Sequence, residues 1–409
     1  MIAAVDRAVR VVVLGAGYRG RAYAAYSEAH PGELEVVGVA DPEQAGTIPS
    51  PRSWRDWREC LAARPDADMA VVALPDALHY EAAMSALAAG YHLLLEKPLA
   101  TTEEQCREIV ATAVARGLLV ITGHVLRYTR YFAHIKAILD SGELGEVVSI
   151  AQQESVGFFK IAHSHCRGNW SNSVKASPII LQKCSHDFDL FSWWLGRRCL
   201  RVSSFGSIKV FRRGNRPAGA ADRCMDCPAE VERGCVWSAK KMYLDYGDRL
   251  GYMFADTSRA AMERVVRETE YGRCVYACDN NVPDHQVVNM EFEGGATVSF
   301  VMAGFTERNV RTTRISCTRG EIVGDGETLH ICSFDGASVD AGGPFSRRLD
   351  NPSRHGGGDF NLMAEAIRLV RKGTAEEIKS TTEEALESHL IAFAAEKSRL
   401  EGGRVIELK

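Results

Sequence analysis

A lysine that directly follows a buried-looking strand is the residue of this chain best suited to chemistry. Residues 93–95 are three leucines at the end of a strand pattern, and Glu96-Lys97-Pro98 comes directly after them. By itself this tripeptide is typical of a solvated turn. An amine at the end of a buried strand can also transfer a proton, if burial lowers its pKa from about 10.4 toward about 7 to 8. The elements around Lys97 must decide between the two interpretations.

A glycine-rich turn near the N-terminus predicts a phosphate-binding site. Residues 9–14 have the apolar pattern of a strand, and Gly15-Ala16-Gly17-Tyr18-Arg19-Gly20 follows in the order G-x-G-x-x-G. Such glycines make a tight turn, let the backbone approach a pyrophosphate, and let the next helix, residues 21–29, pack on the strand. The free N–H groups at that helix start attract phosphates. An ordinary strand-helix-strand unit with a glycine turn is the alternative.

An acidic residue after the second strand indicates which dinucleotide binds. Strand 34–40 ends at Asp41, about twenty residues beyond the glycines. A carboxylate at this point accepts hydrogen bonds from the adenosine ribose hydroxyls and repels a 2′-phosphate. We therefore expect NAD, with NADP less favoured.

Alternating strands and helices up to residue 122 predict a doubly wound parallel sheet. The predicted strands are 9–14, 34–40, 69–74, 91–95 and 118–122, and the helices are 21–29, 79–89 and 102–116. Ligands of such sheets bind outside the carboxyl ends of the strands. Gly15, Asp41, Pro75 and Lys97 all fall at such ends, so Glu96 and Lys97 are expected at the cofactor crevice.

After residue 122 the pattern changes to short strands joined by glycine turns, which predicts a second, α+β domain with an open, mostly antiparallel sheet. Its predicted strands are 147–154, 201–210, 287–292, 297–303, 313–317, 321–324 and 328–332, and helices 360–371 and 382–401 close the chain. We expect a Rossmann NAD-binding domain over 1–122 and a substrate-binding domain over 123–409. The latter carries a cysteine-rich insertion near 222–280, and its helix 355–372 is expected to pack back on the first domain.

Composition favours a small-molecule partner. The 409 residues suffice for two or three domains, and a net charge of −4 provides no general attraction to nucleic acid or to a membrane. No apolar run approaches the ~20 residues of a spanning helix, and Asp6, Arg7 and Arg10 interrupt any secretory signal. A cytoplasmic location is expected, where twelve cysteines are thiols or metal ligands rather than disulfides.

A predicted helix over 177–195 has a polar face. Gln182, His186 and Asp189 recur at helical spacing, opposite a face of large apolar residues. This face is a candidate site, although a solvated surface histidine is an equally simple interpretation of His186.

Taken in order, these motifs resemble the Gfo/Idh/MocA family of NAD(P)-dependent sugar and polyol oxidoreductases. The resemblance spans nearly the whole chain and rests on the glycine motif, Asp41, Pro75 with His79, Glu96-Lys97-Pro98, Cys184-Ser185-His186-Asp187-Phe188-Asp189 and His355-Gly356-Gly357-Gly358-Asp359. It implies Lys97 as a catalytic residue, His186 as its catalytic partner, and a homodimer or homotetramer formed through the open sheet. The cofactor-binding candidates are Gly15, Gly17, Tyr18, Arg19, Gly20, Asp41, Pro75, His79, Glu96 and Lys97.

The chain departs from the family at one position. Many members have an aspartate four residues before the helix histidine, whereas this chain has Gln182 there, followed by Lys183. An amide cannot accept a proton in that role. Lys183 then either binds substrate, helps to lower the pKa of Lys97, or is merely exposed.

Cationic residues upstream of this helix favour an anionic substrate, such as a uronic acid or a sulfonated sugar. Arg167-Gly168-Asn169-Trp170 is similar to a family subgroup that also has a lysine before the helix histidine, and Trp170 is suited to stacking on a sugar; a solvated loop is the alternative. Tyr128 matches another substrate-side segment of the family. The substrate-binding candidates are Tyr128, Lys160, His163, Arg167, Trp170, Gln182, Lys183 and His186, with His165 and Lys175 in the same cationic stretch.

The cysteines of the insertion predict a structural zinc site. Cys224, Cys227 and Cys235 lie within a dozen residues of a sparsely apolar segment, and Cys274 supplies a fourth thiolate, with Cys278 as the alternative fourth ligand. Free thiols are the competing interpretation.

Three functions remain open from the sequence. The first is a dehydrogenase that oxidises a hydroxyl of a sugar, sugar derivative or cyclitol, with Lys97 as acid/base. The second is an NAD-dependent glycosidase that oxidises, eliminates, hydrates and reduces an acidic glycoside such as a sulfoquinovoside. The third is a dinucleotide-sensing protein without catalysis, against which the retention of Lys97 and His186 argues.

Overall fold

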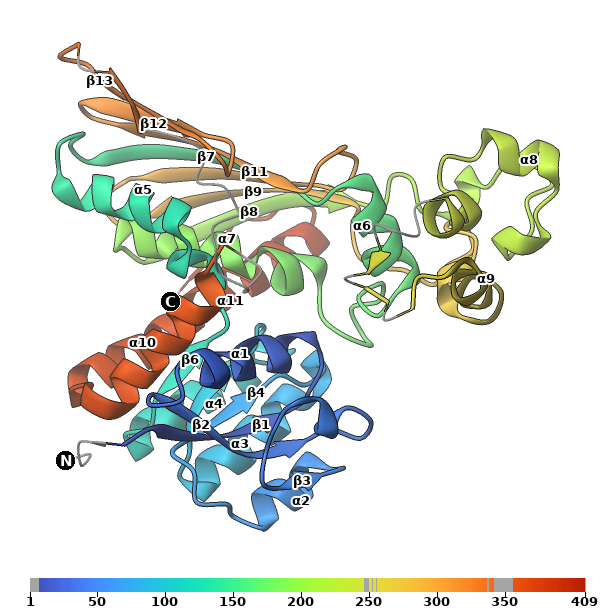
Figure 1. Ribbon diagram of the computed structural model, residues 1–409. Helices are drawn as coiled ribbons and strands as arrows, with labels where there is room; N and C mark the ends of the chain where they lie inside the picture. Colours follow the sequence, from blue (N-terminus) through green and yellow to red (C-terminus); the bar gives the residue numbers. More distant parts are fainter. Residues whose placement is uncertain are drawn as a thin grey trace.

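Six parallel strands form the N-terminal sheet in the order β3-β2-β1-β4-β5-β6 (Figure 1). Their bounds are β1 Val9–Leu14, β2 Leu34–Ala40, β3 Ser53–Trp54, β4 Met69–Val72, β5 His92–Leu95 and β6 Val120–Thr122. All of their pairings are parallel, which confirms the predicted doubly wound sheet. The strands are apolar almost throughout because helices cover both faces.

Four helices connect these strands: α1 Tyr18–Ala29, α2 Trp57–Ala62, α3 His79–Ala89 and α4 Glu103–Arg116. The hydroxyl of Thr102 accepts a hydrogen bond from the backbone of Gln105 and so caps α4. Helices α3 and α4 end at Gly90 and Gly117, which take the left-handed conformation that stops a helix. Because β1, β4 and β5 are parallel neighbours, the loops that follow them lie at one edge of the sheet.

The second sheet has nine strands in the order β14-β13-β12-β11-β7-β10-β9-β8-β15. The bounds are β7 Val147–Ser155, β8 Cys199–Ser207, β9 His285–Phe292, β10 Thr297–Ala303, β11 Val310–Cys317, β12 Gly320–Gly324, β13 Leu329–Ser333, β14 Ser338–Ala341 and β15 Ile406–Glu407. All pairings are antiparallel except that of β7 with β10. The predicted mostly antiparallel sheet is confirmed.

Helices cover one face of this sheet and leave the other open (Figure 1). The covering helices are α5 Arg130–Ser141, α7 Ile179–Leu195 and α11 Ala375–Leu400, while α6 Phe158–Ala162, α8 Ala229–Gly234 and α9 Arg259–Glu268 lie at its end. Helix α5 was not predicted, and α11 begins at Ala375 rather than at 382. The reason is a capping box, in which Thr374 and Glu377 satisfy each other's backbone N–H groups.

Helix α10, Gly358–Lys372, belongs to the C-terminal part of the chain but packs on the N-terminal sheet. Its apolar residues, among them Phe360 and Met363, share a buried cluster with β1 and α1. His355, at the expected start of this helix, lies outside the described residues. The boundary at residue 122 stays a prediction.

The computed structural model describes residues 7–245, 250–251, 253–254, 256–336, 338–341 and 356–408. Among these residues, no helix is both long and apolar enough to cross a membrane.

Candidate functional site

The glycine turn has the shape that dinucleotide phosphates require. Gly15 has a φ of +95°, and a Cβ there would collide with the carbonyl of Ala73. A Cβ on Gly20 would collide with the carbonyl of Gly15, whereas Gly17, at the start of α1, faces open space. The backbone is thus tightly packed beneath the turn and accessible above it, so the turn and the helix start fit a pyrophosphate. Tyr18 is partly exposed beside it.

Asp41 connects the end of β2 to this turn. Its Oδ2 accepts a hydrogen bond from the backbone N–H of Ala16 at 2.8 Å. Its Oδ1 accepts hydrogen bonds from the backbone N–H groups of Glu43 and Gln44 at 2.9 and 2.7 Å. The carboxylate therefore lies at the turn, where its predicted contact with the ribose stays a prediction.

Glu96 and Arg19, both predicted to bind cofactor, contact each other. Arg19 Nε donates to Glu96 Oε1 at 2.6 Å, and the hydroxyl of Tyr23 donates to the same oxygen at 2.6 Å. Arg19 also bonds Asp359 of α10 at 2.8 Å, which ties this helix to the site. Burial works to raise the pKa of Glu96, but Arg19 and Lys97 outweigh it, so that pKa lies below its ordinary value.

His79 holds together the two loops on either side of the crevice. Its Nε2 lies 2.7 Å from the carbonyl oxygen of Leu74, and its Nδ1 lies 2.6 Å from that of Pro98. The ring is buried. It thereby fixes the turn that contains Pro75 against the turn that contains Lys97.

Lys97 reaches from the N-terminal sheet to the helix that carries the predicted partner. Its Nζ donates to the backbone oxygen of Gln182 on α7 at 2.5 Å. Burial lowers its pKa; Asp76 and Glu96 oppose the shift and Lys183 adds to it. His186 lies on the same helix, and burial together with the charge on Lys97 lowers the pKa of His186 well below its usual value. The structure thus brings Lys97, Gln182, Lys183 and His186 together.

Lys183 is not merely exposed, because it joins a buried charge network. It forms an ion pair with Glu154, which is fully buried and also bonds Arg311 at 2.9 Å. Arg311 makes two hydrogen bonds to Asp187, at 2.8 and 3.0 Å. The polar side of α7 therefore faces charged groups of the second sheet.

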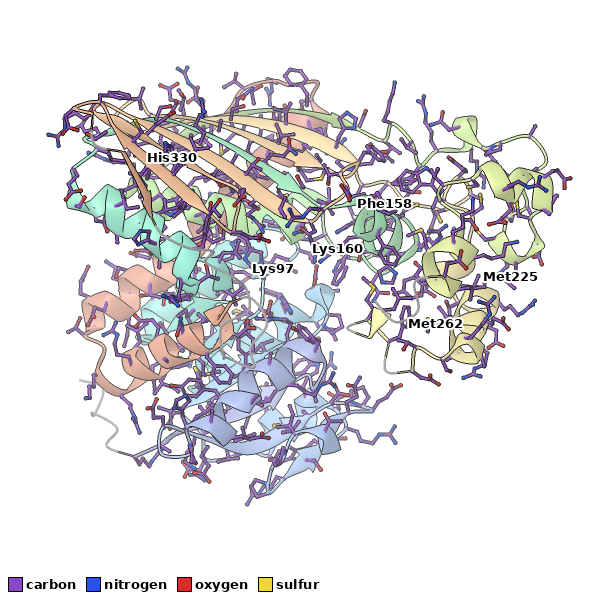
Figure 2. All side chains as sticks on the ribbon, turned by 45° about the horizontal axis from the view of Figure 1, so that its top comes forward. Lys97, Phe158, Lys160, Met225, Met262 and His330 are labelled. Atoms are coloured by element: carbon purple, nitrogen blue, oxygen red, sulfur yellow. The ribbon has the colours of Figure 1, made fainter. Side chains whose placement is uncertain are left out.

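Lys160 and His165 lie on the side of the site that carries Lys97 and Lys183. Figure 2 shows Lys97 between the two sheets and Lys160 at the neighbouring α6. Burial and the charges of Lys183 and Lys97 lower the pKa of Lys160 to about 7, and Glu154 opposes the shift. Lys160 has no hydrogen bond or ion pair to any described residue. His165 is 2 % exposed, with Nδ1 unpartnered, and burial and these lysines lower its pKa.

Two other residues that were predicted to bind substrate make their contacts away from Lys97. Arg167 is buried and donates to the carbonyl oxygens of Arg273 and Trp237 at 2.8 and 2.6 Å, inside the insertion. His163 stacks on Tyr271 with ring centroids 4.5 Å apart. These contacts assign Arg167 and His163 to packing, so neither is carried into the proposed substrate site.

Trp170 and Tyr128 lie at the margins of the site. Trp170 is partly exposed, 6.2 Å from the ring of His165. Tyr128 accepts a hydrogen bond from Asn361 at its backbone oxygen, and burial raises the pKa of its hydroxyl. Their substrate contacts stay predictions.

Several residues of the site were missed in the sequence. None of His124, Glu154, Asp187, Asp189 and Arg311 was predicted as a site residue, although Asp187 and Asp189 belong to the helix motif of the family resemblance. Glu154 and Arg311 stand opposite each other on neighbouring strands β7 and β11. A charged residue within each strand was the available signal, but the pairing of the two strands could not be read from spacing.

The predicted zinc ligands lie around one small cavity. Cys224, Cys227, Cys235 and Cys274 all line a void of about 20 Å³ in the insertion, and all are free thiols. Cys278 lies apart, beside Cys166. Within the described part of the chain, no three His, Cys, Asp or Glu side chains are arranged to hold a metal ion. The four thiols thus line one cavity, and their binding of zinc stays a prediction.

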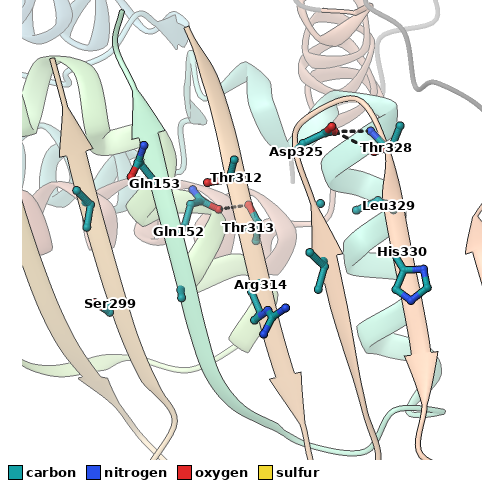
Figure 3. Close-up of a pocket in the computed structure, with 14 residues that line it drawn as sticks. Gln152, Gln153, Ser299, Thr312, Thr313, Arg314, Asp325, Thr328, Leu329 and His330 are labelled. Carbon is teal, nitrogen blue, oxygen red and sulfur yellow. Dashed lines mark hydrogen bonds between the residues drawn. The ribbon is translucent and has the colours of Figure 1, made fainter. Parts of the chain in front are cut away.

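A hollow lined by residues of the second sheet lies on its open face, and Lys97 is not among its lining residues. It measures about 900 Å³, and Figure 3 shows its lining on strands β7, β11, β12 and β13. Ser299, Ala151, Arg314, Val323 and His330 follow one another across the sheet in register. Some of these five side chains are polar and others apolar, and they do not form an acid/base pair for proton transfer. Self-association through this face stays a prediction.

Both halves of the chain match sequence models of one family. Residues 9–124 match the GFO_IDH_MocA model, described as an oxidoreductase family with an NAD-binding Rossmann fold. Residues 136–408 match the C-terminal alpha/beta domain of the same oxidoreductase family. The two matches together cover most of the chain.

Curated relatives are similar over a shorter stretch. Inositol 2-dehydrogenase 2 of Saccharopolyspora erythraea is 30% identical over 34% of this chain and 38% of that protein. The 2,7-anhydro-N-acetylneuraminate hydratase of Mediterraneibacter gnavus is 28% identical over 35% of this chain and 38% of that protein. The matched stretches thus span less than two fifths of either relative.

A solved structure is similar over the full length. Levoglucosan dehydrogenase in complex with NADH and L-sorbose superposes with a TM-score of 0.69 at 18% identity, covering 98% of this chain and 99% of that one. At this identity the likeness concerns the fold.

Proposed function

Because this chain belongs to the Gfo/Idh/MocA oxidoreductase family, we propose that it oxidises a hydroxyl of a sugar or cyclitol with NAD as hydride acceptor. The observation that carries the proposal is the position of Lys97. Its half-buried amine, with a lowered pKa, lies between the glycine turn and His186. Relatives named as inositol and levoglucosan dehydrogenases support the substrate class.

Oxidation of an alcohol requires the loss of a proton and a hydride from the same H–C–O–H unit. NAD, held at Gly15–Gly20 and Asp41, supplies the hydride acceptor. Lys97 accepts the hydroxyl proton, and burial, which lowers its pKa, favours the neutral amine that this step requires. His186 orients the substrate oxygen or shares the proton, because Gln182 cannot. Glu96 and His79 hold the Lys97 turn in place.

The test is a panel of sugars and cyclitols incubated with the protein and NAD. Formation of NADH in proportion to the sugar consumed is expected. Parallel incubations with NADP should react more slowly, because Asp41 repels the 2′-phosphate. Silence across neutral and acidic sugars would favour the dinucleotide-sensing alternative and refute the proposal.

We further propose that the substrate carries an anionic group bound by Lys160. Lys97 and Lys183 have partners, whereas Lys160 has none among the described residues and lies near both. A carboxylate or sulfonate there would pair with its ammonium, and His165 Nδ1 would supply a further hydrogen bond.

This proposal predicts how affinity depends on pH. An anion requires protonated Lys160, whose pKa is about 7. The dissociation constant of D-glucuronate, measured by NADH fluorescence, should be constant below pH 7 and rise up to about tenfold per pH unit above it. The Lys160→Met variant should bind more weakly and lose this dependence. D-Glucose, the neutral control, should show neither effect; equal behaviour of both sugars would contradict the proposal.

An NAD-dependent glycosidase is the second candidate, favoured by the similarity to a protein named as a hydratase of an acidic sugar. In that reaction the hydride returns to the product, so NAD is not consumed. An aryl glycoside separates the candidates: phenol release with catalytic NAD supports the glycosidase, and stoichiometric NADH supports the dehydrogenase.

A structural zinc at the four insertion cysteines is a further proposal. Its support is that Cys224, Cys227, Cys235 and Cys274 line one void; binding would draw the thiolates together at Zn–S distances of about 2.3 Å. Protein purified without chelator is expected to contain about one zinc per chain, measured by elemental analysis. Cys227→Ser should lose the metal and Cys60→Ser should keep it. Zinc-free protein with an intact fold would remove the proposal.

A further inference from the structure

A second histidine lies behind His186, buried and edge-on to it. His124 follows β6 and is 3 % exposed, and its ring centroid lies 5.6 Å from that of His186 at an interplanar angle of 68°. Two ring nitrogens here have no hydrogen-bond partner although both are buried: Nε2 of His124 and Nδ1 of His186. Unpartnered buried nitrogens are costly, and here they belong to neighbouring rings.

Asp189 determines which nitrogen of His124 carries hydrogen. Its Oδ1 lies 3.1 Å from His124 Nδ1. Arg127 donates two hydrogen bonds to the same carboxylate, at 2.8 and 2.6 Å. Burial works to raise the pKa of Asp189, but Arg127 and His124 outweigh it and hold that pKa well below its ordinary value. Asp189 therefore stays ionised, binds the Nδ1–H of His124, and leaves Nε2 as a proton acceptor.

We propose that His124, backed by Asp189, receives from His186 the proton that leaves the substrate hydroxyl. This inference rests on the proposed function. The substrate O–H bond breaks and its proton passes to Lys97 Nζ, while the hydride leaves carbon for NAD. Lys97 then protonates His186 Nε2, and His186 Nδ1–H passes its proton to His124 Nε2. The carboxylate of Asp189 faces the protonated ring of His124. When the product leaves, His124 returns its proton to His186 Nδ1 and His186 Nε2 releases one to water, which restores both starting tautomers.

The relay supplies the proton acceptor that Gln182 cannot provide. An amide at that position cannot take a proton from Lys97 or His186, so the proton needs another acceptor. His124 touches neither substrate nor cofactor and acts only through His186, which makes it a positioning residue. The ionised carboxylate behind it is the arrangement by which a buried histidine becomes a proton acceptor.

His389 provides a matched control. Its ring lies 5.5 Å from that of His124 and is equally buried. Both of its nitrogens are bonded to backbone: Nε2 accepts from the N–H of Leu99 at 2.9 Å, and Nδ1 lies 2.8 Å from the oxygen of Ala385. Neither ring nitrogen is available to accept a proton, so His389 is not part of the relay.

The test replaces each histidine in the full chain. His124→Asn keeps a donor for Asp189 but has no acceptor nitrogen facing His186, and should lower the single-turnover rate of hydride transfer by about 100-fold. His124→Gly should regain rate on addition of imidazole. His389→Gln should show neither the rate loss nor the imidazole response.

Two results would overturn the relay. One is an unchanged hydride-transfer rate in His124→Asn; the other is an equal loss in the His124 and His389 variants without rescue by imidazole, which would indicate packing alone. A readout without turnover is the ¹⁵N NMR spectrum of the wild-type histidines, where the Nδ1–H tautomer of His124 is expected and the Nε2–H tautomer would refute the relay. A wild-type protein that reduces no NAD would refute the proposed function instead.

Discussion

Replacing Lys97 with methionine is expected to lower kcat by about 10²- to 10⁴-fold, the contribution of a positioned general base. Methionine keeps much of the apolar stem but cannot accept a proton. The dissociation constant of NAD should change little, because the phosphates and ribose are assigned to the glycine turn and Asp41. Steady-state NADH formation and a fluorescence titration of the cofactor measure the two quantities separately.

The control for this variant is Lys175→Met. Lys175 has a side chain 67% exposed and pairs with Asp279 on the surface, so its removal should leave both quantities unchanged. An active Lys97→Met protein would refute the assignment of Lys97. A protein that loses NAD binding in parallel with turnover would show instead that the turn had been disrupted.

Replacing Arg311 with methionine is expected to destabilise the C-terminal part of the protein by about 3–5 kcal/mol, the cost of leaving buried charges uncompensated. Arg311 is the shared partner of Glu154 and Asp187, both fully buried. The loss should be largest at neutral and higher pH. It should shrink as pH falls, because the carboxyls, with pKa values raised by burial and no arginine to oppose it, then become protonated.

Urea denaturation at pH 5 and pH 8 measures this effect. Arg311→Lys is the matched variant because it keeps the charge but not the bidentate geometry. Its free energy of unfolding should lie between those of the wild type and Arg311→Met. Asp187→Asn added to Arg311→Met should recover part of the stability by removing one unpaired charge. A cost below 1 kcal/mol at pH 8 would mean that water enters the network and screens it.

Most of the N-terminal domain could be predicted because its signals are local. Apolar strands, the glycine turn and Asp41 follow one another within a few residues, and the structure has the expected parallel sheet, to which β3 adds a short strand that was not predicted. The start of α11 was placed too late, although Thr374 and Glu377 carry the capping signature. The spacing of its apolar residues alone indicates a later start than its N-terminal cap does.

In the structure, the residues on recognisable motifs lie near one another, whereas Arg167, predicted from a loop, lies inside the insertion. Lys97 and His186 meet, and Lys183 contributes to lowering the pKa of Lys97 as one of the alternatives had it. Arg167 was predicted to bind substrate from its charge and from the similarity of Arg167-Gly168-Asn169-Trp170 to a family subgroup. Its guanidinium is buried in the insertion, and a charge count cannot reveal whether backbone carbonyls will satisfy an arginine.

The amino-acid sequence was sufficient to identify the family, to predict the parallel sheet and to place Lys97 at the end of β5. These depend on spacings of a few residues, which the backbone converts directly into positions on a strand end or helix face. Three features follow from the tertiary structure alone: Glu154 pairs with Lys183, Lys160 has no hydrogen bond or ion pair to any described residue, and the ring of His124 lies beside that of His186. Those contacts join segments far apart in the chain, and their geometry follows from how the two sheets and α7 pack.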